Sequence, residues 1–207
     1  MNRHKPIEEQ KLAARARFAN HKATVVQQDE NFLVMDWRHI SGTSDYFVRY
    51  ILDLRLGQLI VTGDLGDSIA CWYNPVTPEN MSRYVRDINY YMGKLKATSD
   101  RYDYDWEDIK ADIDALENEY REMLDDYEDI TEEDFEEDFE NIRNIFDEIN
   151  VGYDVNYPTE LIEIFEKYST DWWESDFSRI GQRISPRIVL WSVGFQMAWE
   201  QIGGSQE

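Results

Sequence analysis

Two neighbouring segments of the chain place apolar residues at alternating steps of three and four, which is the spacing of a helical seam. The spacing predicts one helix over about Tyr104–Glu128 and a second over Glu132–Asn150, joined as a hairpin. Thr131, with Asp134 three residues later, resembles a capping box and marks the start of the second helix, and Gly152 follows its end. The seam residues are Trp106, Ile109, Ile113, Leu116, Tyr120, Met123 and Tyr127 in the first helix, and Phe135, Phe139, Ile142, Phe146 and Ile149 in the second.

The chain before Pro75 has the short runs and turn residues of an antiparallel sheet. Successive runs are joined by turns that contain glycine or acidic residues, as hairpin loops often do. We therefore predict a meander of four or five strands, and the mixed alternation within them indicates that both faces of the sheet are partly covered. The runs are Ala23–Gln28, Phe32–Arg38, Tyr46–Leu54, Gln58–Thr62 and Ser68–Tyr73.

Four further segments have the caps or the periodicity of helices. Thr77 is placed to cap a helix that begins at Pro78, and Ser185 is placed to cap one that begins at Pro186. The last helix is apolar on nearly every side, so it must be buried within the fold or against a partner. The four helices are expected at Ile7–Asn20, Pro78–Lys96, Thr159–Tyr168 and Pro186–Ile202.

Together these elements predict an α+β fold, in which an antiparallel sheet packs with helices and an acidic helical hairpin protrudes. Residues 1–100 supply the N-terminal helix, the sheet and a further helix. Residues 101–150 form the hairpin, and residues 151–207 supply C-terminal helices that pack on the sheet. We expect all three parts to form one composite domain.

The last helix carries Trp191, Phe195 and Trp199 four residues apart, an aromatic ridge of the kind that anchors protein interfaces. The sheet covers one side of such a helix, and covering the rest requires a second layer. We therefore predict a homodimer. The alternative, in which other amphipathic helices of the same chain supply that layer, stays open.

Most of the negative charge lies in the predicted hairpin. The formal net charge of the chain is −22 at pH 7. Residues 101–150 hold 22 Asp and Glu against four Lys and Arg, whereas the other 157 residues hold 21 against 17. A protein made acidic for solubility or high salt would spread its acids over the whole surface, so the asymmetry favours interaction with a basic partner. A merely solvated acidic face remains the alternative.

The sequence offers no pattern typical of catalysis, cofactor binding or a specific metal site. Its three histidines are widely spaced, and Cys71 is expected to be an inert thiol in a strand. No nucleophile elbow or phosphate-binding glycine loop is present, and the acid-rich segment Asp125–Asp134 lacks the glycine of an EF-hand loop. We therefore predict a protein that is not an enzyme and that binds no cofactor and no metal.

Three features predict a soluble protein of the cytoplasm that does not bind membranes. The chain has a single cysteine, which fits a reducing compartment. Its N-terminus has no apolar signal region. The longest apolar stretch, Ile188–Trp199, is too short to span a bilayer.

The acids that lie off the two seams suggest mimicry of nucleic acid. Side chains three or four residues apart on a helix lie about 5–6 Å from each other, close to the spacing of phosphates along a nucleic-acid strand. Two adjacent helices can therefore occupy the Lys- and Arg-lined groove of a nucleic-acid-binding enzyme, without binding nucleic acid themselves. The predicted phosphate surrogates are Asp112, Glu119, Glu122, Asp126, Glu133, Glu137 and Glu140.

Part of the sheet segment carries a recognisable motif, an "LxIxGDxG" turn followed by a strand that ends near Trp. The matching residues are Leu59, Val61, Gly63, Asp64, Gly66 and Trp72. This motif resembles a strand cassette in small acidic proteins of phages and other mobile elements. The resemblance implies an anti-CRISPR-like inhibitor of a bacterial defence nuclease, acting in the host cytoplasm on a basic nucleic-acid-binding enzyme. A CRISPR effector is the preferred partner, and whether it is bound as free or as guide-loaded enzyme stays open.

A second hypothesis comes from a different class of protein. Aromatic-rich seams can pair between chains, and the apolar last helix can form a two-fold interface. The chain would then be a structural or assembly protein that self-associates through its helical seams. In that case the acids would only keep other molecules away.

Overall fold

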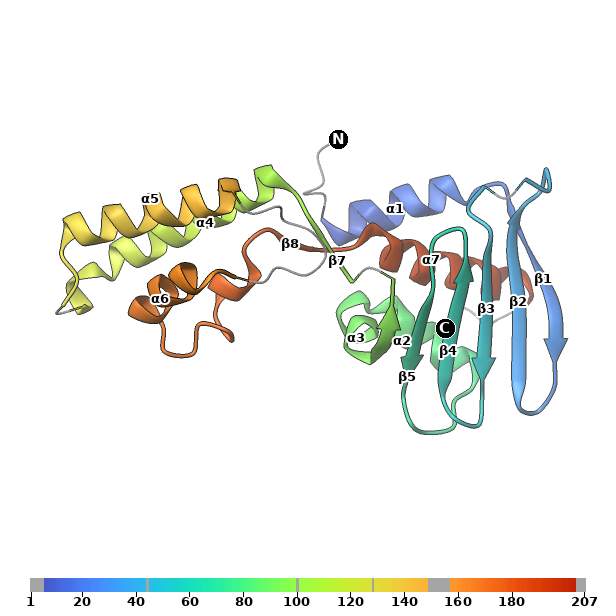
Figure 1. Ribbon diagram of the computed structural model, residues 1–207. Helices are drawn as coiled ribbons and strands as arrows, with labels where there is room; N and C mark the ends of the chain where they lie inside the picture. The colour runs from blue at the N-terminus through green and yellow to red at the C-terminus, as the bar shows by residue number, and fades with distance from the viewer. Residues whose placement is uncertain (1–5, 44, 100, 128, 149–156, 204–207) are drawn as a thin grey trace. The chain divides into compact units, whose positions relative to one another are not determined.

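The chain divides into two compact units in the computed structural model (Figure 1). Unit 1 comprises Met1–Arg101 and Ser185–Glu207, and unit 2 comprises Tyr102–Ile184. Unit 2 is thus inserted between two segments of unit 1. At the junction, the Ser185 amide donates a 3.1 Å hydrogen bond to the Arg101 carbonyl. The structure describes residues 6–43, 45–99, 101–127, 129–148 and 157–203.

Unit 1 contains a six-stranded antiparallel sheet whose strands lie side by side in chain order (Figure 1). This confirms the predicted α+β fold and its meander. All five predicted strands are present, and a sixth strand begins where the sequence predicted the end of the helix Pro78–Lys96. The strands are β1 (His21–Gln28), β2 (Phe32–His39), β3 (Val48–Asp53), β4 (Gln58–Gly63), β5 (Ser68–Cys71) and β6 (Leu95–Thr98).

One face of this sheet packs against α7 (Pro186–Gln201). Alternate residues of β3, including Tyr50, point to the helix and are buried. The Tyr50 hydroxyl donates a 3.0 Å hydrogen bond to the carbonyl of Trp191. A Cβ at Gly194 would collide with the same hydroxyl, so the glycine allows α7 to lie close to the sheet.

The rest of α7 is covered by other helices of unit 1. Contacts come from α1 (Ile7–Arg17) on one side and from α2 (Pro78–Arg86) and α3 (Ile88–Lys94) on the other. The ridge of the last helix is therefore internal core: its three aromatic residues are at most 8 % exposed. The homodimer prediction loses its physical basis, because the second layer that it required comes from the same chain.

The single helix predicted over Pro78–Lys96 is two helices. Thr77 caps the first as predicted, since its side chain accepts a 3.2 Å hydrogen bond from the Asn80 amide. The break falls at Asp87, whose carboxylate accepts a 3.0 Å hydrogen bond from the Tyr90 amide and so caps α3. Such a local bond competes with helix continuation. At α7, by contrast, the Ser185 side chain makes no capping bond.

The described residues of unit 2 form three helices and two 3₁₀ turns, together with a two-stranded antiparallel ribbon (Figure 1). The predicted hairpin forms, and α6 and η2 cover its seam, so it does not stand alone. The elements are β7 (Tyr102–Tyr104), α4 (Trp106–Glu122), η1 (Leu124–Asp126), α5 (Glu132–Glu148), α6 (Thr159–Tyr168), η2 (Asp176–Arg179) and β8 (Gln182–Ile184).

The core of unit 2 explains why the chain divides differently from the predicted organisation, which placed residues 151–207 on the sheet. The α6 helix packs against α4 and α5 instead, and α7 packs on the sheet. The apolar face of α6 completes the core that the two seams begin. The buried residues are Ile109, Ile113, Leu116, Phe135, Phe139, Ile142, Phe146, Leu161, Ile164, Phe165, Tyr168, Phe177 and Ile180.

The capping box at the start of α5 is confirmed. Thr131 Oγ1 accepts a 3.1 Å hydrogen bond from the Asp134 amide, and Asp134 Oδ2 accepts one of 3.1 Å from the Thr131 amide. The preceding helix ends at Glu122, earlier than predicted, because acids such as Asp125 disfavour the C-terminus of a helix dipole. The predicted end of α5, Asn150 with Gly152, lies outside the described residues.

Candidate functional site

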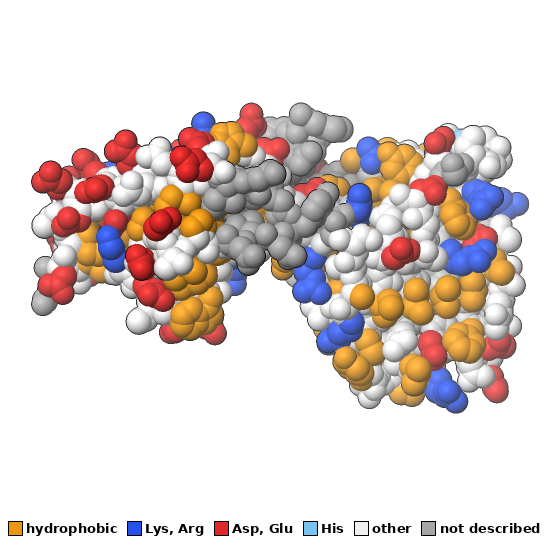
Figure 2. Space-filling model, in the orientation of Figure 1, with side chains coloured by type: hydrophobic (Ala, Val, Ile, Leu, Met, Phe, Trp, Pro, Cys, Tyr) orange, Lys and Arg blue, Asp and Glu red, His pale blue; other side chains and the backbone are white. Residues whose placement is uncertain are grey.

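The two units differ sharply in charge. Unit 2 carries 29 Asp and Glu against six Lys and Arg, whereas unit 1 carries 14 against 15. Figure 2 shows acidic side chains gathered over the helices of unit 2 and charges of both signs mixed over unit 1. The inserted unit therefore carries the entire net negative charge, and unit 1 is close to neutral. The candidate site is the surface of unit 2.

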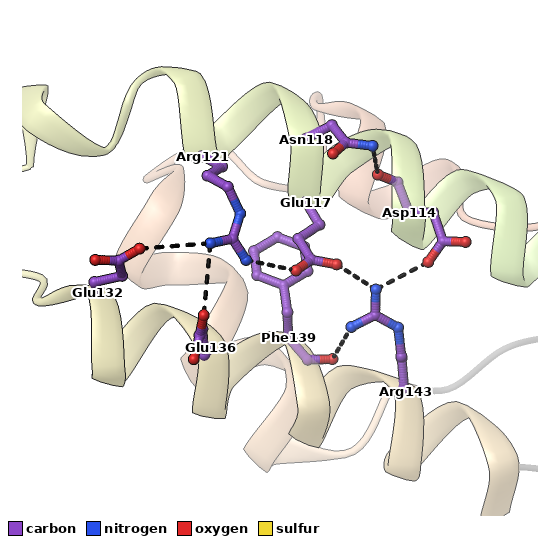
Figure 3. A network of polar contacts seen from close by, with 8 residues as sticks. All are labelled: Asp114, Glu117, Asn118, Arg121, Glu132, Glu136, Phe139 and Arg143. Atoms are coloured by element: carbon purple, nitrogen blue, oxygen red, sulfur yellow. Dashed lines mark hydrogen bonds and ion pairs between the residues drawn. The ribbon is translucent and has the colours of Figure 1, made fainter.

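Two arginines bridge α4 and α5 along one side of the hairpin (Figure 3). Arg121 lies 2.9 Å from Glu117 on its own helix, and Arg143 reaches across from α5 to the same carboxylate. Burial acts to raise the pKa of Glu117, but the bonds from Arg143 and Arg121 outweigh it and lower that pKa. This side of the hairpin is therefore partly neutralised. The other carboxylates of the network are Asp114, 2.9 Å from Arg143, and Glu132 and Glu136, 3.8 and 3.6 Å from Arg121.

Asp112, predicted as a phosphate surrogate, is engaged inside unit 2. Arg183 donates two hydrogen bonds to its carboxylate, of 2.7 and 2.8 Å, and the Gly181 amide donates a third of 2.8 Å. The hydrogen bond to Asp112 is the main cause that raises the pKa of Arg183. The pair ties α4 to β8, which makes Asp112 a structural residue of the unit and a poor candidate for contact with a partner.

A second internal pair ties α5 to α6. Asp138 is almost fully buried and accepts a 2.7 Å hydrogen bond from Lys167 and a 3.0 Å hydrogen bond from the Tyr168 hydroxyl. Burial, together with the nearby charge of Asp138, raises the pKa of Tyr168 well above its ordinary value. Sequence periodicity placed Asp138 among the acids off the seam, but the structure uses it to hold the core together.

The other six predicted residues are exposed, and three of them share one face of α5. Glu133, Glu137 and Glu140 occupy positions i, i+4 and i+7, and Glu148 continues the row, which we call the α5 stripe. The stripe lies opposite the buried seam and spans about 22 Å at 1.5 Å per residue. In the part of the chain that the structure describes, its carboxylates form no ion pair. They are therefore available to a partner.

The outer face of α4 is less acidic than that of α5. Glu119 and Glu122 are exposed, as is Asp126 in η1, in agreement with their predicted surface position. The face opposite the seam of α4, however, includes Ala111 and Ala115. The structure thus brings the predicted residues of α5 together in one row and leaves those of α4 and η1 more scattered.

Sequence periodicity missed the contribution of α6. Glu160 and Glu163 line a groove of about 320 Å³ between α5 and α6, together with the stripe residue Glu137. The groove extends the acidic surface from α5 to the neighbouring helix. The spacing of Glu160 and Glu163 on a predicted amphipathic helix was visible in the sequence, but nothing local indicated that this helix would lie beside α5.

Comparison with known proteins adds no relative. No family model matches the chain, no curated protein matches it, and no solved structure resembles it. The function is therefore inferred from the geometry and charge of the two units.

The described residues hold no group suited to a metal ion and no helix suited to a membrane. No three of their His, Cys, Asp and Glu side chains are placed to hold a metal ion together. None of the described helices combines the length and the apolar character needed to cross a membrane. Cys71 is a buried free thiol in β5, and His21 is buried at the start of β1.

Proposed function

We propose that unit 2 is an acidic decoy that occupies the basic nucleic-acid-binding surface of a protein partner and thereby inhibits it. The observation that carries this proposal is the concentration of charge in one inserted unit. A chain that was acidic only for solubility would have no reason to leave unit 1 with 14 acids and 15 bases. Segregated charge favours a directed interaction.

The density of charge on α5 fits such a decoy. Nine of its 17 residues are Asp or Glu. At 1.5 Å per residue this is about one carboxylate per 3 Å of helix, against one phosphate per 3.4 Å along a DNA strand. Ion pairs and the cap engage some of these acids, and the α5 stripe remains exposed. The stripe presents its four exposed acids over about 22 Å, about one carboxylate per 6 Å, and such a face can occupy positions in a cationic groove that phosphates would take.

A rigid scaffold supports the same function. The aromatic core of unit 2, the Arg121 and Arg143 bridges and the Asp112–Arg183 pair hold the helices in place. A preorganised surface loses little conformational entropy when it binds. We propose further that the protein is a non-catalytic inhibitor acting in the cytoplasm. The motif of the sheet segment suggests a bacterial defence nuclease as its target, with a CRISPR effector first.

The alternative, an assembly protein that self-associates through its seams, has less support. Trp106 is exposed, but the central seam residues of α4 and α5 are buried in one core with α6, and the aromatic ridge of α7 is buried within unit 1. Neither surface is exposed for pairing with a second copy.

The experiment that tests the proposal is displacement of a fluorescent oligonucleotide at low salt. Guide-loaded CRISPR nucleases, restriction endonucleases and other cationic nucleic-acid-binding proteins are each bound to the labelled strand, and the protein is then titrated in. Release of the strand from a subset of these proteins, with direct association confirmed by gel filtration, supports the decoy. Failure to displace the strand from any of them contradicts it.

A further inference from the structure

A groove of about 800 Å³ runs over α7 in unit 1, between α1 and α2. It lies within the unit that the proposed decoy does not use, so it concerns a second property of the protein. Its volume falls in the range of small-molecule sites, roughly 300–1,000 Å³. Both α1 and α2 pack on α7, and side chains of all three helices line the groove.

The periodicity of the three helices determines which side chains line the groove. On α1, Lys11, Leu12 and Arg15 belong to one helical face. On α7, Val193 and Gln196 are three residues apart and form the floor. Leu12 is 67 % exposed, although it is the largest apolar side chain on the wall. The groove therefore offers an apolar wall beside polar groups.

The polar floor is fixed in position. Gln196 is 5 % exposed, and its amide nitrogen donates hydrogen bonds of 3.0 and 3.3 Å to the hydroxyl and the carbonyl of Ser192. The Ser192 hydroxyl in turn donates a 2.6 Å hydrogen bond to the Val85 carbonyl on α2. Because these hydrogen bonds fix the Gln196 carboxamide, it constrains the orientation of a ligand in the groove.

Three cations converge on the groove from two helices. Lys11 is 2.8 Å from Glu8, and Arg15 is 3.5 Å from Glu200, so each has an acidic neighbour on the rim. Arg86, at the end of α2, forms no ion pair or hydrogen bond with its side chain among the described residues. Guanidinium groups bind carboxylate and phosphate through two parallel hydrogen bonds. Arg86 is the cation best placed to receive an external anion.

We propose that this groove binds a small organic anion, one with a carboxylate or a phosphate group on an apolar body. The anionic group pairs with Arg86 and with Arg15. The ion pair of Arg15 with Glu200 is longer than that of Lys11 with Glu8, so Arg15 exchanges its partner more easily. The apolar body lies against Leu12 and Val193. A ligand that has only the charge or only the apolar body makes half of these contacts.

Four probes separate the two kinds of contact. Phenyl phosphate and benzoate carry both an anion and an apolar ring, phenol carries only the ring, and inorganic phosphate carries only the anion. Each is titrated into the full-length protein labelled with nitrogen-15, and chemical shifts of the Gln196 side-chain amide and the Arg86 Nε group are followed. We expect at least one of the two ring-bearing anions to bind about tenfold more tightly than phenol and inorganic phosphate. The stronger of the two identifies carboxylate or phosphate as the preferred group.

Substitutions then assign the site. Arg86→Gln is expected to weaken binding of the preferred probe about tenfold, the loss of one charge-assisted contact. Arg55→Gln is the matched control, because Arg55 is exposed in unit 1 and does not line the groove. Circular dichroism confirms that both variants are folded.

Two results would overturn the proposal. One is the absence of groove shifts with all four probes up to about 10 mM. The other is equal affinity of the wild type and Arg86→Gln for the preferred probe. Neither result bears on the decoy, whose test is displacement of an oligonucleotide.

Discussion

Arg183 holds Asp112 by two nearly parallel hydrogen bonds, of 2.7 and 2.8 Å, across 71 positions of sequence. The same carboxylate accepts the Gly181 amide. One side chain thereby fixes the end of unit 2 to its first helix. This arrangement assigns Asp112 to stability, although its position on the helix had suggested contact with a partner.

Replacing Asp112 is therefore expected to destabilise unit 2 and to leave decoy binding intact. Asp112→Ala removes two hydrogen bonds from the Arg183 guanidinium, which keeps the Gln182 carbonyl and Asp108, and it leaves the Gly181 amide without its acceptor. We expect it to lower the free energy of unfolding by about 2 kcal/mol. Urea denaturation measures the change. Glu122→Ala, at an exposed position, is the control and should stay within about 0.5 kcal/mol of wild type. An Asp112→Ala variant as stable as wild type but unable to displace oligonucleotide would restore Asp112 as a contact residue.

The capping box gives a second prediction about stability. Thr131→Ala removes the acceptor of the Asp134 amide and one of the bonds that lower the pKa of Asp134. We expect this variant to lose about 1 kcal/mol in the free energy of unfolding. We expect Thr131→Ser, which keeps a hydroxyl at the cap, to retain most of that stability. Thermal unfolding of both variants distinguishes the cap from a general effect of substitution. Equal losses in the two variants would argue against the capping role.

The stability of unit 1 is expected to depend on the protonation of His21. Burial lowers the pKa of this imidazole from its ordinary value of 6.5, and His39 acts in the same direction, whereas the Asp45 carbonyl opposes them. Since the folded state disfavours the protonated form, the contribution to stability is present above pH 6.5 and is lost as the pH falls below it.

The measurement is the free energy of unfolding of wild type and His21→Gln between pH 7.5 and pH 5. The wild type should lose more stability on acidification than His21→Gln, because only the wild type has the buried imidazole to protonate. Parallel curves for the two proteins would mean that the titration of His21 does not contribute. The many carboxylates titrate in both proteins and so cancel in the comparison.

Local signals in the sequence predicted the local structure well. The seam spacing predicted both hairpin helices, the Thr131 box predicted the start of α5, and the turn residues predicted five of the strands of the large sheet. Each of these signals depends on residues within a few positions of each other. The short strand β6 and the break at Asp87 were not predicted. The apolar face of the predicted helix Pro78–Lys96 continues past Asp87, so the pattern gave no sign that Asp87 caps a new helix.

The long-range arrangement could not be predicted from one sequence. The apolar face of α6 fits a sheet as well as a helical hairpin, so its place in unit 2 became visible only in the structure. The side chains that bond to Asp112 and Asp138 also became visible only in the structure. Arg183 and Lys167 lie far in sequence from Asp112 and Asp138, and periodicity alone could not separate these engaged carboxylates from the exposed α5 stripe.

The α5 stripe provides the central test of the decoy. Reversal of Glu133, Glu137 and Glu140 to Lys changes the charge of the stripe, while the buried seam stays the same. Reversal of the exposed residues Glu30, Asp67 and Glu79 in unit 1 is the matched control, with an identical change in net charge. Circular dichroism and gel filtration establish that both triple variants are folded.

The most direct measurement uses a partner from which the wild type displaces the oligonucleotide. The affinity of the wild type, the stripe reversal and the control reversal for that partner is measured as a function of salt concentration. We predict that the stripe reversal weakens binding at least about 100-fold at low salt and flattens the dependence of log K on log salt concentration. The control reversal should keep the affinity and the slope close to those of the wild type. Equal losses in the two reversals, or no loss in the stripe reversal, would contradict the proposal that the acidic face of unit 2 is the binding surface.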